Sequence, residues 1–234
     1  MKHAILPATL SLALAAAPVL AAERSFDLSG FTEVAAGAGL DVEIVQSEGF
    51  SVTAEGAPRG LKRLEIETSG DRLLIDQQAR GLERFSPLAM ALGDEVVVRV
   101  TLPELAAVFA SAGSDVTAVG SAAEAFTAEA SSGADLVLTG IDAARVTLAA
   151  SSGAGLEASG RCGDLAAEAS SGADLEARGL ACDSAEAQGS SGATLSLTAT
   201  TVHAAASSGA DVDVWGADSV EAEEGSGGDV TTHD

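Results

Sequence analysis

The sequence has few of the side chains that proteins use to recognise bases, sugars or anions. Its 234 residues include no tyrosine, one tryptophan and only 3% aromatic residues, so few rings can stack on sugars or bases. Twelve lysines and arginines stand against 35 aspartates and glutamates, for a net charge of −23. Negative charge of this size repels nucleic acids and anionic membrane surfaces. We therefore expect no nucleic-acid partner.

Histidine and nucleophile motifs are also scarce. His3, His203 and His233 are separated along the chain, His203 on an expected strand and His233 at an expected frayed C-terminus. The GSSG stretch at residues 189–192 lacks the G-x-S-x-G spacing of a nucleophile elbow. Carboxylates occur over the whole chain, so no pair of them stands out as a general acid and base. We predict no catalytic residues, no metal site and no cofactor.

Residues 1–21 have the composition of a signal peptide. A short polar start with Lys2 precedes an apolar Ala/Leu run, and small residues that include Ala21 suit a cleavage site. An uncleaved membrane anchor is the alternative, but Pro7 and Pro18 interrupt the run and no positive flank follows it. The prediction is export to the periplasm or secretion, with no membrane span after cleavage and an acidic, soluble mature chain.

A phrase close to SSGAD recurs along the second half of the chain. The corner glycines of this phrase are Gly113, Gly133, Gly153, Gly172, Gly192, Gly209 and Gly227. They follow one another at an almost constant interval, and such near-constant spacing is typical of a solenoid. Residues 105–234 are therefore predicted to form regular repeats.

Apolar residues alternate with polar ones inside each repeat, for example at Leu136 and Leu138 or at Val212 and Val214. A period of two indicates strands with one buried face. Leucine-rich repeats have a similar length but need a helix and a Leu/Asn spacing that the chain lacks. The fold predicted is all-β, a parallel β-helix with coils of about 19 residues. Each coil reads as strand, polar turn, strand and SSGA corner.

The recurring phrase is interpreted as a corner of the coil. Glycine supplies a backbone conformation with positive φ, and the serine hydroxyls bond neighbouring turn amides. Ligand binding by the same phrase is the alternative. The aspartates after the corner are interrupted at Gly155 and Thr194, so we predict that folding does not require calcium.

Residues 22–104 are predicted to be all-β and to form irregular first coils of one continuous unit. The letters GAGL at residues 37–40 repeat those at 153–156, and the interval from Gly37 to Gly113 is close to four periods. Gly56 and Gly93 fall near the corners expected between them. Residues 79–92 lack alternation and are predicted to cap one end, with contact to a partner as the alternative. The acidic last coil is expected to discourage pairing of its edge strands.

Cys162 and Cys182 are the two cysteines of the chain, and the interval between them is one repeat. Both fall in the polar turn of adjacent coils, where stacked Cα atoms lie about 4.8 Å apart and within reach of a disulfide. Two buried thiols in the coil interior are the alternative. Because an exported protein meets an oxidising compartment, we predict a structural disulfide between them.

The segments FDLSGFTEVAAGAGLDVEIVQSEGFSVTAEG, RLLID and VVVRVTLPELAAVFASAGSDV, followed by SSGAD-type repeats, resemble the GIN domain family of autotransporter adhesin heads. The resemblance covers nearly all of the mature chain. It implies a right-handed β-helix in the bacterial envelope, a handedness that crossover rules also favour. The function predicted is that of a non-enzymatic, adhesin-like binding or scaffold protein whose partner is an envelope protein or glycan, with oligomers allowed. The alternative is a β-helical carbohydrate-active enzyme, which would gather Trp215, an arginine and two carboxylates on a concave face.

Overall fold

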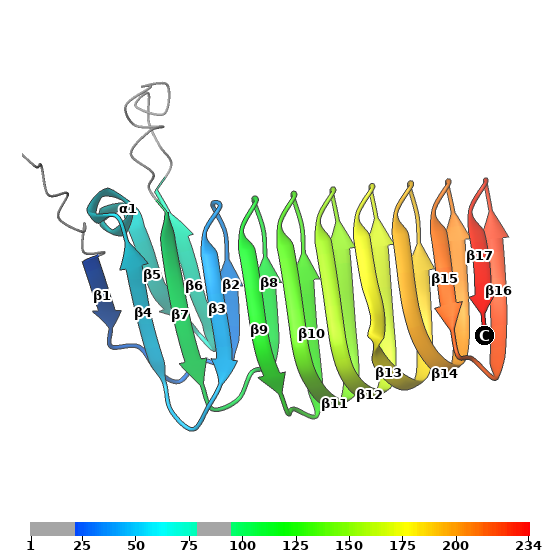
Figure 1. The fold of residues 1–234 in the computed structure, drawn as a ribbon, viewed down its shortest axis with the longest axis horizontal. Helices are drawn as coiled ribbons and strands as arrows, with labels where there is room; N and C mark the ends of the chain where they lie inside the picture. Colours follow the sequence, from blue (N-terminus) through cyan, green and yellow to red (C-terminus); the bar gives the residue numbers. More distant parts are fainter. Residues whose placement is uncertain (1–21, 79–94) are drawn as a thin grey trace, which may run out of the picture.

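The computed structural model describes residues 22–78 and 95–234. Of these described residues, 70% are in strands and 3% in a helix, and the coils stack into one elongated, right-handed β-solenoid (Figure 1). The prediction of an all-β parallel β-helix is therefore confirmed. The signal peptide predicted at residues 1–21 and the cap predicted at residues 79–92 lie outside the described residues. Within the described residues, no helix is long and apolar enough to span a membrane.

The regular part of the solenoid consists of parallel strands that each pair with their equivalents one coil away. These strands are β8 (Ala107–Ala110), β9 (Asp115–Ser121), β10 (Ala125–Ala130), β11 (Asp135–Ser151), β12 (Gly155–Ser170), β13 (Asp174–Gly189), β14 (Thr194–Ser207), β15 (Asp211–Trp215), β16 (Ser219–Gly225) and β17 (Asp229–His233). Each coil has one tight corner and one broad bend at opposite ends (Figure 1). The chain therefore forms two faces, the entry face of strands that lead into the corners and the exit face of strands that leave them.

The polar turn expected inside each repeat is a curved, continuous strand in β11, β12, β13 and β14, whereas a short break separates β9 from β10 and β15 from β16. Strand β11 runs unbroken through the bend, and its register with β12 continues there at Ala143 with Cys162 and at Arg145 with Asp164. Because neighbouring coils keep their backbone pairing around the curve, the chain needs no separate turn at this point. The prediction of strand, turn and strand was wrong here, although the polar residues do mark the bend.

The tight corners form because two successive residues adopt positive φ. At the first SSGA corner φ is 55° at Ser132 and 69° at Gly133, and the Ala134 N–H donates to the Ser131 carbonyl at 3.2 Å. Two central residues with positive φ are the requirement of a type I′ turn. Each of the seven glycines aligned by the sequence has positive φ, and the serine or alanine before it has it too. Sequence reasoning missed this second left-handed residue.

The N-terminal part contains both parallel and antiparallel strands. Its elements are β1 (Ala22–Phe26), β2 (Glu33–Ala36), β3 (Asp41–Gln46), β4 (Ser51–Gly56), α1 (Pro58–Arg63), β5 (Leu64–Ser69), β6 (Arg72–Gln77) and β7 (Val96–Leu102). Strands β2 and β3 form a coil with its corner at Ala38 and Gly39. Strand β5 pairs antiparallel with β6, and β4 pairs antiparallel with β7 and β1. Among the described strands, antiparallel pairing is confined to this end of the solenoid.

The first corner lies directly beside the corner of Gly113 and not four coils away. Ala36 pairs with Ala110 and Asp41 pairs with Asp115, so β2 and β3 stack on β8 and β9. The expectation of an intermediate corner near Gly56 was wrong, because Gly56 ends β4 and the described residues in between form β4, α1, β5, β6 and β7 on the far side of β2 and β3. Gly93 lies outside the described residues. Gly39, with a φ of 68°, occupies the corner position that the letters GAGL assigned to Gly37.

The core is a column of small and branched apolar side chains between the two faces. Leu136, Leu156, Leu175, Leu195 and Val212 follow one another in register, each at most 2% exposed. Alternate residues point outward, as the period of two predicts. The outward residues are therefore the ones that determine what the solenoid contacts.

Candidate functional site

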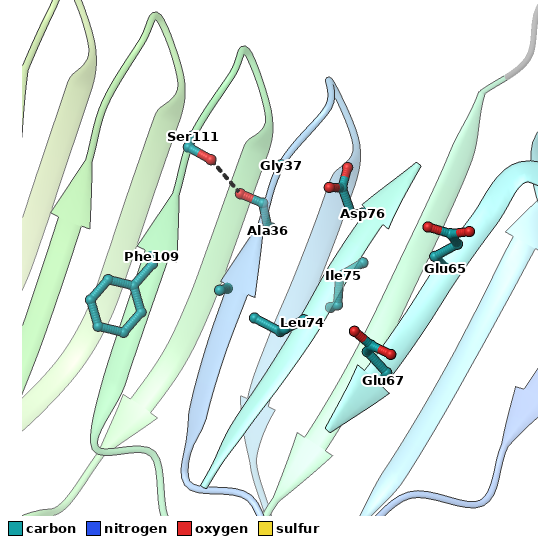
Figure 2. Close-up of a pocket in the computed structure, with 10 residues that line it drawn as sticks. Ala36, Gly37, Glu65, Glu67, Leu74, Ile75, Asp76, Phe109 and Ser111 are labelled. Carbon is teal, nitrogen blue, oxygen red and sulfur yellow. Dashed lines mark hydrogen bonds between the residues drawn. The ribbon is translucent and has the colours of Figure 1, made fainter. Parts of the chain in front are cut away.

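The entry face carries a shallow depression over β2 (Figure 2). It has a volume of about 300 Å³ and is lined by Ala35, Ala36, Gly37, Glu65, Glu67, Leu74, Ile75, Asp76, Phe109 and Ser111. It forms because Ala35 lies in register between Leu74 on β6 and Phe109 on β8. A methyl group flanked by two large side chains leaves a gap, and the small Gly37 extends it towards the corner.

The two walls of this depression differ in chemistry. Glu65, Glu67 and Asp76 lie to one side of Leu74, and Phe109 lies to the other (Figure 2). The carboxylates can accept hydrogen bonds from hydroxyl or ammonium groups. The guanidinium carbon of Arg72 lies 3.9 Å from the centre of the Phe109 ring. The depression thus has a polar wall and an apolar wall, the combination that orients small ligands in binding sites.

Two adjoining depressions lie near the other end of the same face, over β14. Their volumes are about 310 and 220 Å³, and both include Gln188, Ala205 and Glu223. Ala205 lies in register between Gln188 and Glu223, so the cause is again an alanine between longer side chains. His203 beside it contacts Glu221, with Nδ1 and Oε2 3.0 Å apart.

An outward alanine recurs at every third strand of this face. The residues in register with Phe109 on successive strands of this face form a column of outward side chains. The alanines of this column are Ala35, Ala149 (which lies between Glu129 and Glu168) and Ala205. Three strand spacings amount to about 14 Å. The entry face is therefore corrugated, with small residues at intervals and carboxylates between them. The single sequence could not show this pattern, because it requires the register of β2 beside β6 and β8.

The corner glycines border a column of aspartates on the exit face. Asp115 pairs with both Asp41 and Asp135, so three carboxylates follow one another before Gly155 interrupts the column. The sequence had placed only two of them together, since it did not identify Asp41 as part of the column. Within the described residues, no group of three or more possible ligands is arranged to hold a metal ion.

Trp215 lies in a stack of side chains and not on an open groove. The His233 ring lies parallel to it with centroids 4.2 Å apart, and the guanidinium carbon of Arg178 lies 4.1 Å from the indole centroid. These two groups come from opposite sides of β15, so both faces of the indole are covered. Asp213 bonds His233 Nε2 at 2.7 Å. The tryptophan and arginine do meet, but the ring has no free face for a sugar.

His233 belongs to strand β17, where the sequence analysis had expected a frayed terminus. Its stacking on Trp215 and its contact with Asp213 fix the last strand to the coil before it. His203 and His233 each contact a carboxylate, and they lie on different faces of the solenoid. The structure therefore does not bring the described histidines together.

Arginines in the body of the solenoid pair with carboxylates on neighbouring strands. Arg99 bonds Glu55 and Glu43, and these hydrogen bonds raise the pKa of the guanidinium above its usual value. Asp142 raises the pKa of Arg161 in the same way. These pairs are exposed, so each contributes little to stability. Because arginines and lysines are few, most carboxylates on both faces have no cationic partner among the described residues.

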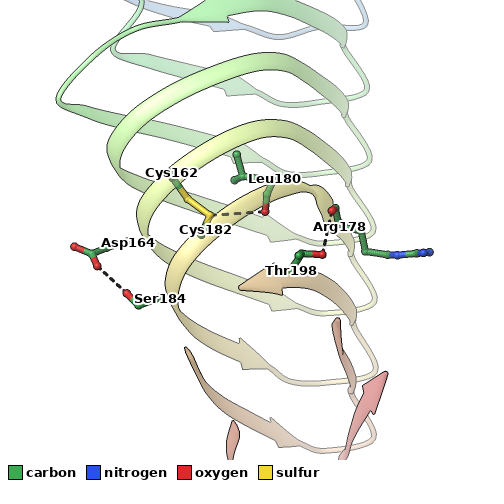
Figure 3. Close-up of a disulfide and its surroundings, with 7 residues drawn as sticks. All are labelled: Cys162, Asp164, Arg178, Leu180, Cys182, Ser184 and Thr198. Carbon is green, nitrogen blue, oxygen red and sulfur yellow. Dashed lines mark hydrogen bonds between the residues drawn. A yellow bond between two sulfur atoms is a disulfide. The ribbon is translucent and has the colours of Figure 1, made fainter. Parts of the chain in front are cut away.

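Cys162 and Cys182 form the predicted disulfide at the bend (Figure 3). Their Cα atoms are 4.6 Å apart, and the two residues are in register between β12 and β13. Both side chains are buried, at 9% and 6% exposure, so the bond lies at the edge of the core rather than in a solvated turn. Ala143 and Ala199 hold the same position in the adjacent coils. The bond therefore staples two coils through positions that otherwise need only a small side chain.

A family model described as "Putative auto-transporter adhesin, head GIN domain" matches residues 30–232. No curated protein matches the chain. Among solved structures, the chain is similar to a "putative adhesin" from Bacteroides fragilis, with a TM-score of 0.78, 12% identity, and coverage of 91% of this chain and 97% of the other. A "putative adhesin" from Parabacteroides merdae gives a TM-score of 0.71 at 11% identity, with 93% and 98% covered. A "putative lipid binding protein" from Parabacteroides distasonis gives a TM-score of 0.69 at 13% identity, with 93% of this chain and 98% of the other covered. At these identities the likeness is one of fold.

Proposed function

The chain belongs to the family of auto-transporter adhesin head GIN domains, and from this premise we propose that it is an exported, adhesin-like binding protein of the bacterial envelope. In this proposal it has no enzymatic activity, and it binds an envelope protein or glycan through the entry face. The observation that carries the proposal is the corrugated surface described above, in which depressions over Ala35 and Ala205 are walled by carboxylates. Folds alone do not specify a function, so this face and not the fold supports the proposal.

The face suits binding more than bond cleavage. Depressions over Ala35 and Ala205, six strand spacings or about 29 Å apart, offer separate weak contacts along one rigid surface. Several weak contacts to one repetitive partner give a strong overall attachment, because each later contact is intramolecular. A solenoid is well suited to hold such contacts at fixed spacing, since every coil rests on its neighbours.

The test is to fill the depressions and measure attachment. The purified chain is immobilised and presented with envelope extract and with arrayed bacterial glycans. Ala35→Leu combined with Ala205→Gln should lower the binding of the retained partner at least tenfold, because longer side chains occupy both gaps. Thr117→Gln lengthens an exposed residue of the exit face and serves as the matched control. If the filled variant binds as the parent does, the entry face is not the binding surface.

Export and the absence of enzymatic activity have separate tests. N-terminal sequencing of the protein recovered from the periplasm or medium should begin at Ala22, the residue after the proposed cleavage site. Incubation with bacterial polysaccharides should release no oligosaccharides. A chain that keeps Met1, or one that cleaves a polysaccharide, contradicts the corresponding part of the proposal.

A further inference from the structure

We propose that copies of this chain associate end to end, with the basic N-terminal tip of one solenoid against the acidic C-terminal tip of the next. The N-terminal tip comprises β1, α1 and β5, and the C-terminal tip comprises β16 and β17 (Figure 1). The occupant of each tip is thus a second copy of this chain. The inference concerns self-association and does not depend on the partner of the entry face.

The C-terminal tip exposes strand edges and apolar side chains that are buried in every earlier coil. Strands β16 and β17 pair with β14 and β15, and no described strand pairs with their other edges. Val220 and Ala222 are in register with Val202 and Ala204 and hold the same inward positions. Val202 and Ala204 are only 1% and 3% exposed. In the last coil, however, Val220 is half-buried and Ala222 is exposed. Unpaired edges over an apolar interior recruit other strands.

Negative charge surrounds this opening. Glu224 is in register with Ala206, so it holds an inward-facing position, and its Oε1 accepts a hydrogen bond of 3.0 Å from the Val230 N–H. Glu223 and Asp229 are exposed beside it. The Glu224 carboxylate therefore lies across the interior of the last coil, and two such acidic tips repel each other. The expectation that acidic residues discourage edge pairing therefore applies to contact between two C-terminal tips.

The opposite tip carries cations without carboxylate partners. Arg24 is in register with the buried Ala54, so it too holds an inward-facing position; its Nη1 lies 3.4 Å from the Leu61 carbonyl of α1. Arg59 and Lys62 are exposed on α1. These three make no ion pair within the described residues, whereas most arginines of the body pair with carboxylates across strands. The acids of this tip are Glu23 beside Arg24 and the pair Glu65 and Glu67 on β5, and that pair lines the depression of the entry face (Figure 2).

The two tips fit each other in charge and in shape. Each places one charged side chain in the interior position of its terminal coil, Arg24 at one end and Glu224 at the other. Both are cross-sections of one solenoid, so the edges of β5 and β1 that no described strand pairs with belong to the same two faces as those of β16 and β17. A contact between unlike ends is heterologous and produces linear chains of copies. Local attraction acts over about one Debye length, so the distant body charges weaken it little at physiological salt.

Sedimentation velocity of the purified chain over a range of concentrations tests the proposal. The weight-average mass should at least double between dilute and concentrated samples, and added salt should lower it. An N-tip variant (Arg59→Glu, Lys62→Glu) and a C-tip variant (Glu223→Lys, Glu224→Lys) should each remain at the monomer mass. Their equimolar mixture should associate again, because each reversed tip then meets an oppositely charged one.

A body variant (Glu129→Lys, Glu157→Lys) has the same change in charge as the C-tip variant and should associate like the parent, since both residues are exposed far from the tips. Circular dichroism confirms that each variant is folded, and recovery in the mixture shows it independently. A parent chain that stays monomeric, tip variants that associate like the parent, or a mixture that stays monomeric would each overturn the proposal.

Discussion

At the scale of single residues, the coil distinguishes positions that need a backbone conformation from positions that need space. Gly133 has a φ of 69°, and a Cβ added there would meet no atom within 4 Å. Gly160 has a φ of 138°, and a Cβ there would lie 2.2 Å from the Ile141 carbonyl oxygen of the adjacent coil. The first glycine serves the turn, whereas the second allows two coils to approach.

Alanine substitution should separate these two roles. Gly133→Ala should lower the free energy of unfolding by about 1 kcal/mol, the cost of a left-handed alanine. Gly160→Ala should cost roughly 3 kcal/mol or more, because strain in a glycine-only conformation is joined by overlap with backbone. Urea denaturation of the two variants beside the parent measures both. Equal losses would show that the contact with Ile141 relaxes without cost.

The disulfide offers a second residue-scale prediction. Replacing Cys162 and Cys182 together by alanine should lower the free energy of unfolding by about 3 kcal/mol, the value for a closed loop of this size. Alanine already occupies the equivalent positions at Ala143 and Ala199, so no new cavity or clash confuses the result. Denaturation with and without reductant checks it. The parent should lose stability on reduction and the double variant should not; a variant as stable as the oxidised parent contradicts the staple.

Residue-scale features were predictable where they depended on spacing alone. The disulfide followed from a separation of one repeat, and the positive φ of the corner glycines followed from the absence of Cβ. The left-handed conformation of Ser132 did not follow, because serine reaches it only under the constraint of the neighbouring corners. There the Gly133 N–H donates to the Ser152 carbonyl of the next turn at 3.2 Å, a contact that the local sequence does not contain.

At the scale of elements, strand register decides which side chains meet. The sequence predicted the strands of residues 105–234 because their alternation is local. It could not place β2 and β3 beside β8 and β9, since that pairing joins strands far apart in the sequence and passes over a hairpin and a helix. For the same reason it missed the depression over Ala35 and the run of three aspartates. A surface site on a solenoid combines side chains from several coils. Its residues can therefore be identified only once the register between those coils is known.

The aspartate column gives a prediction at this scale. Asp115→Asn should raise the free energy of unfolding by about 1 kcal/mol at low salt, because it removes repulsion from both Asp41 and Asp135. Asp174→Asn is the matched control, since its neighbours in register are Gly155 and Thr194. High salt should reduce the difference between the two variants. An equal effect of both substitutions would show that the column carries no local repulsion, and a chelator that unfolds the parent would indicate a bound cation instead.

At the scale of the whole molecule, stability is shared between neighbouring coils. Each central coil is paired on both sides, whereas β16 and β17 are paired on one side and most of their residues are exposed. In such a chain of units the free energy of opening depends on how many interfaces a coil shares. The staple between Cys162 and Cys182 adds to the interface of β12 and β13, in the middle of the stack. Stability should therefore fall from β12 and β13 towards the C-terminal end.

Hydrogen exchange followed by mass spectrometry can measure this gradient, because amides exchange according to the local free energy of opening. Peptides of β16 and β17 should exchange first and those of β12 and β13 last. Reduction of the disulfide should speed exchange mainly in β12 and β13, since it removes a constraint between those two strands and leaves the pairing elsewhere intact. The Cys162→Ala, Cys182→Ala double variant without reductant is the control and should match the reduced parent. Uniform exchange along the stack would instead mean that the coils open as one cooperative unit, and that the last coil is held as firmly as the centre by the stacking of His233 on Trp215.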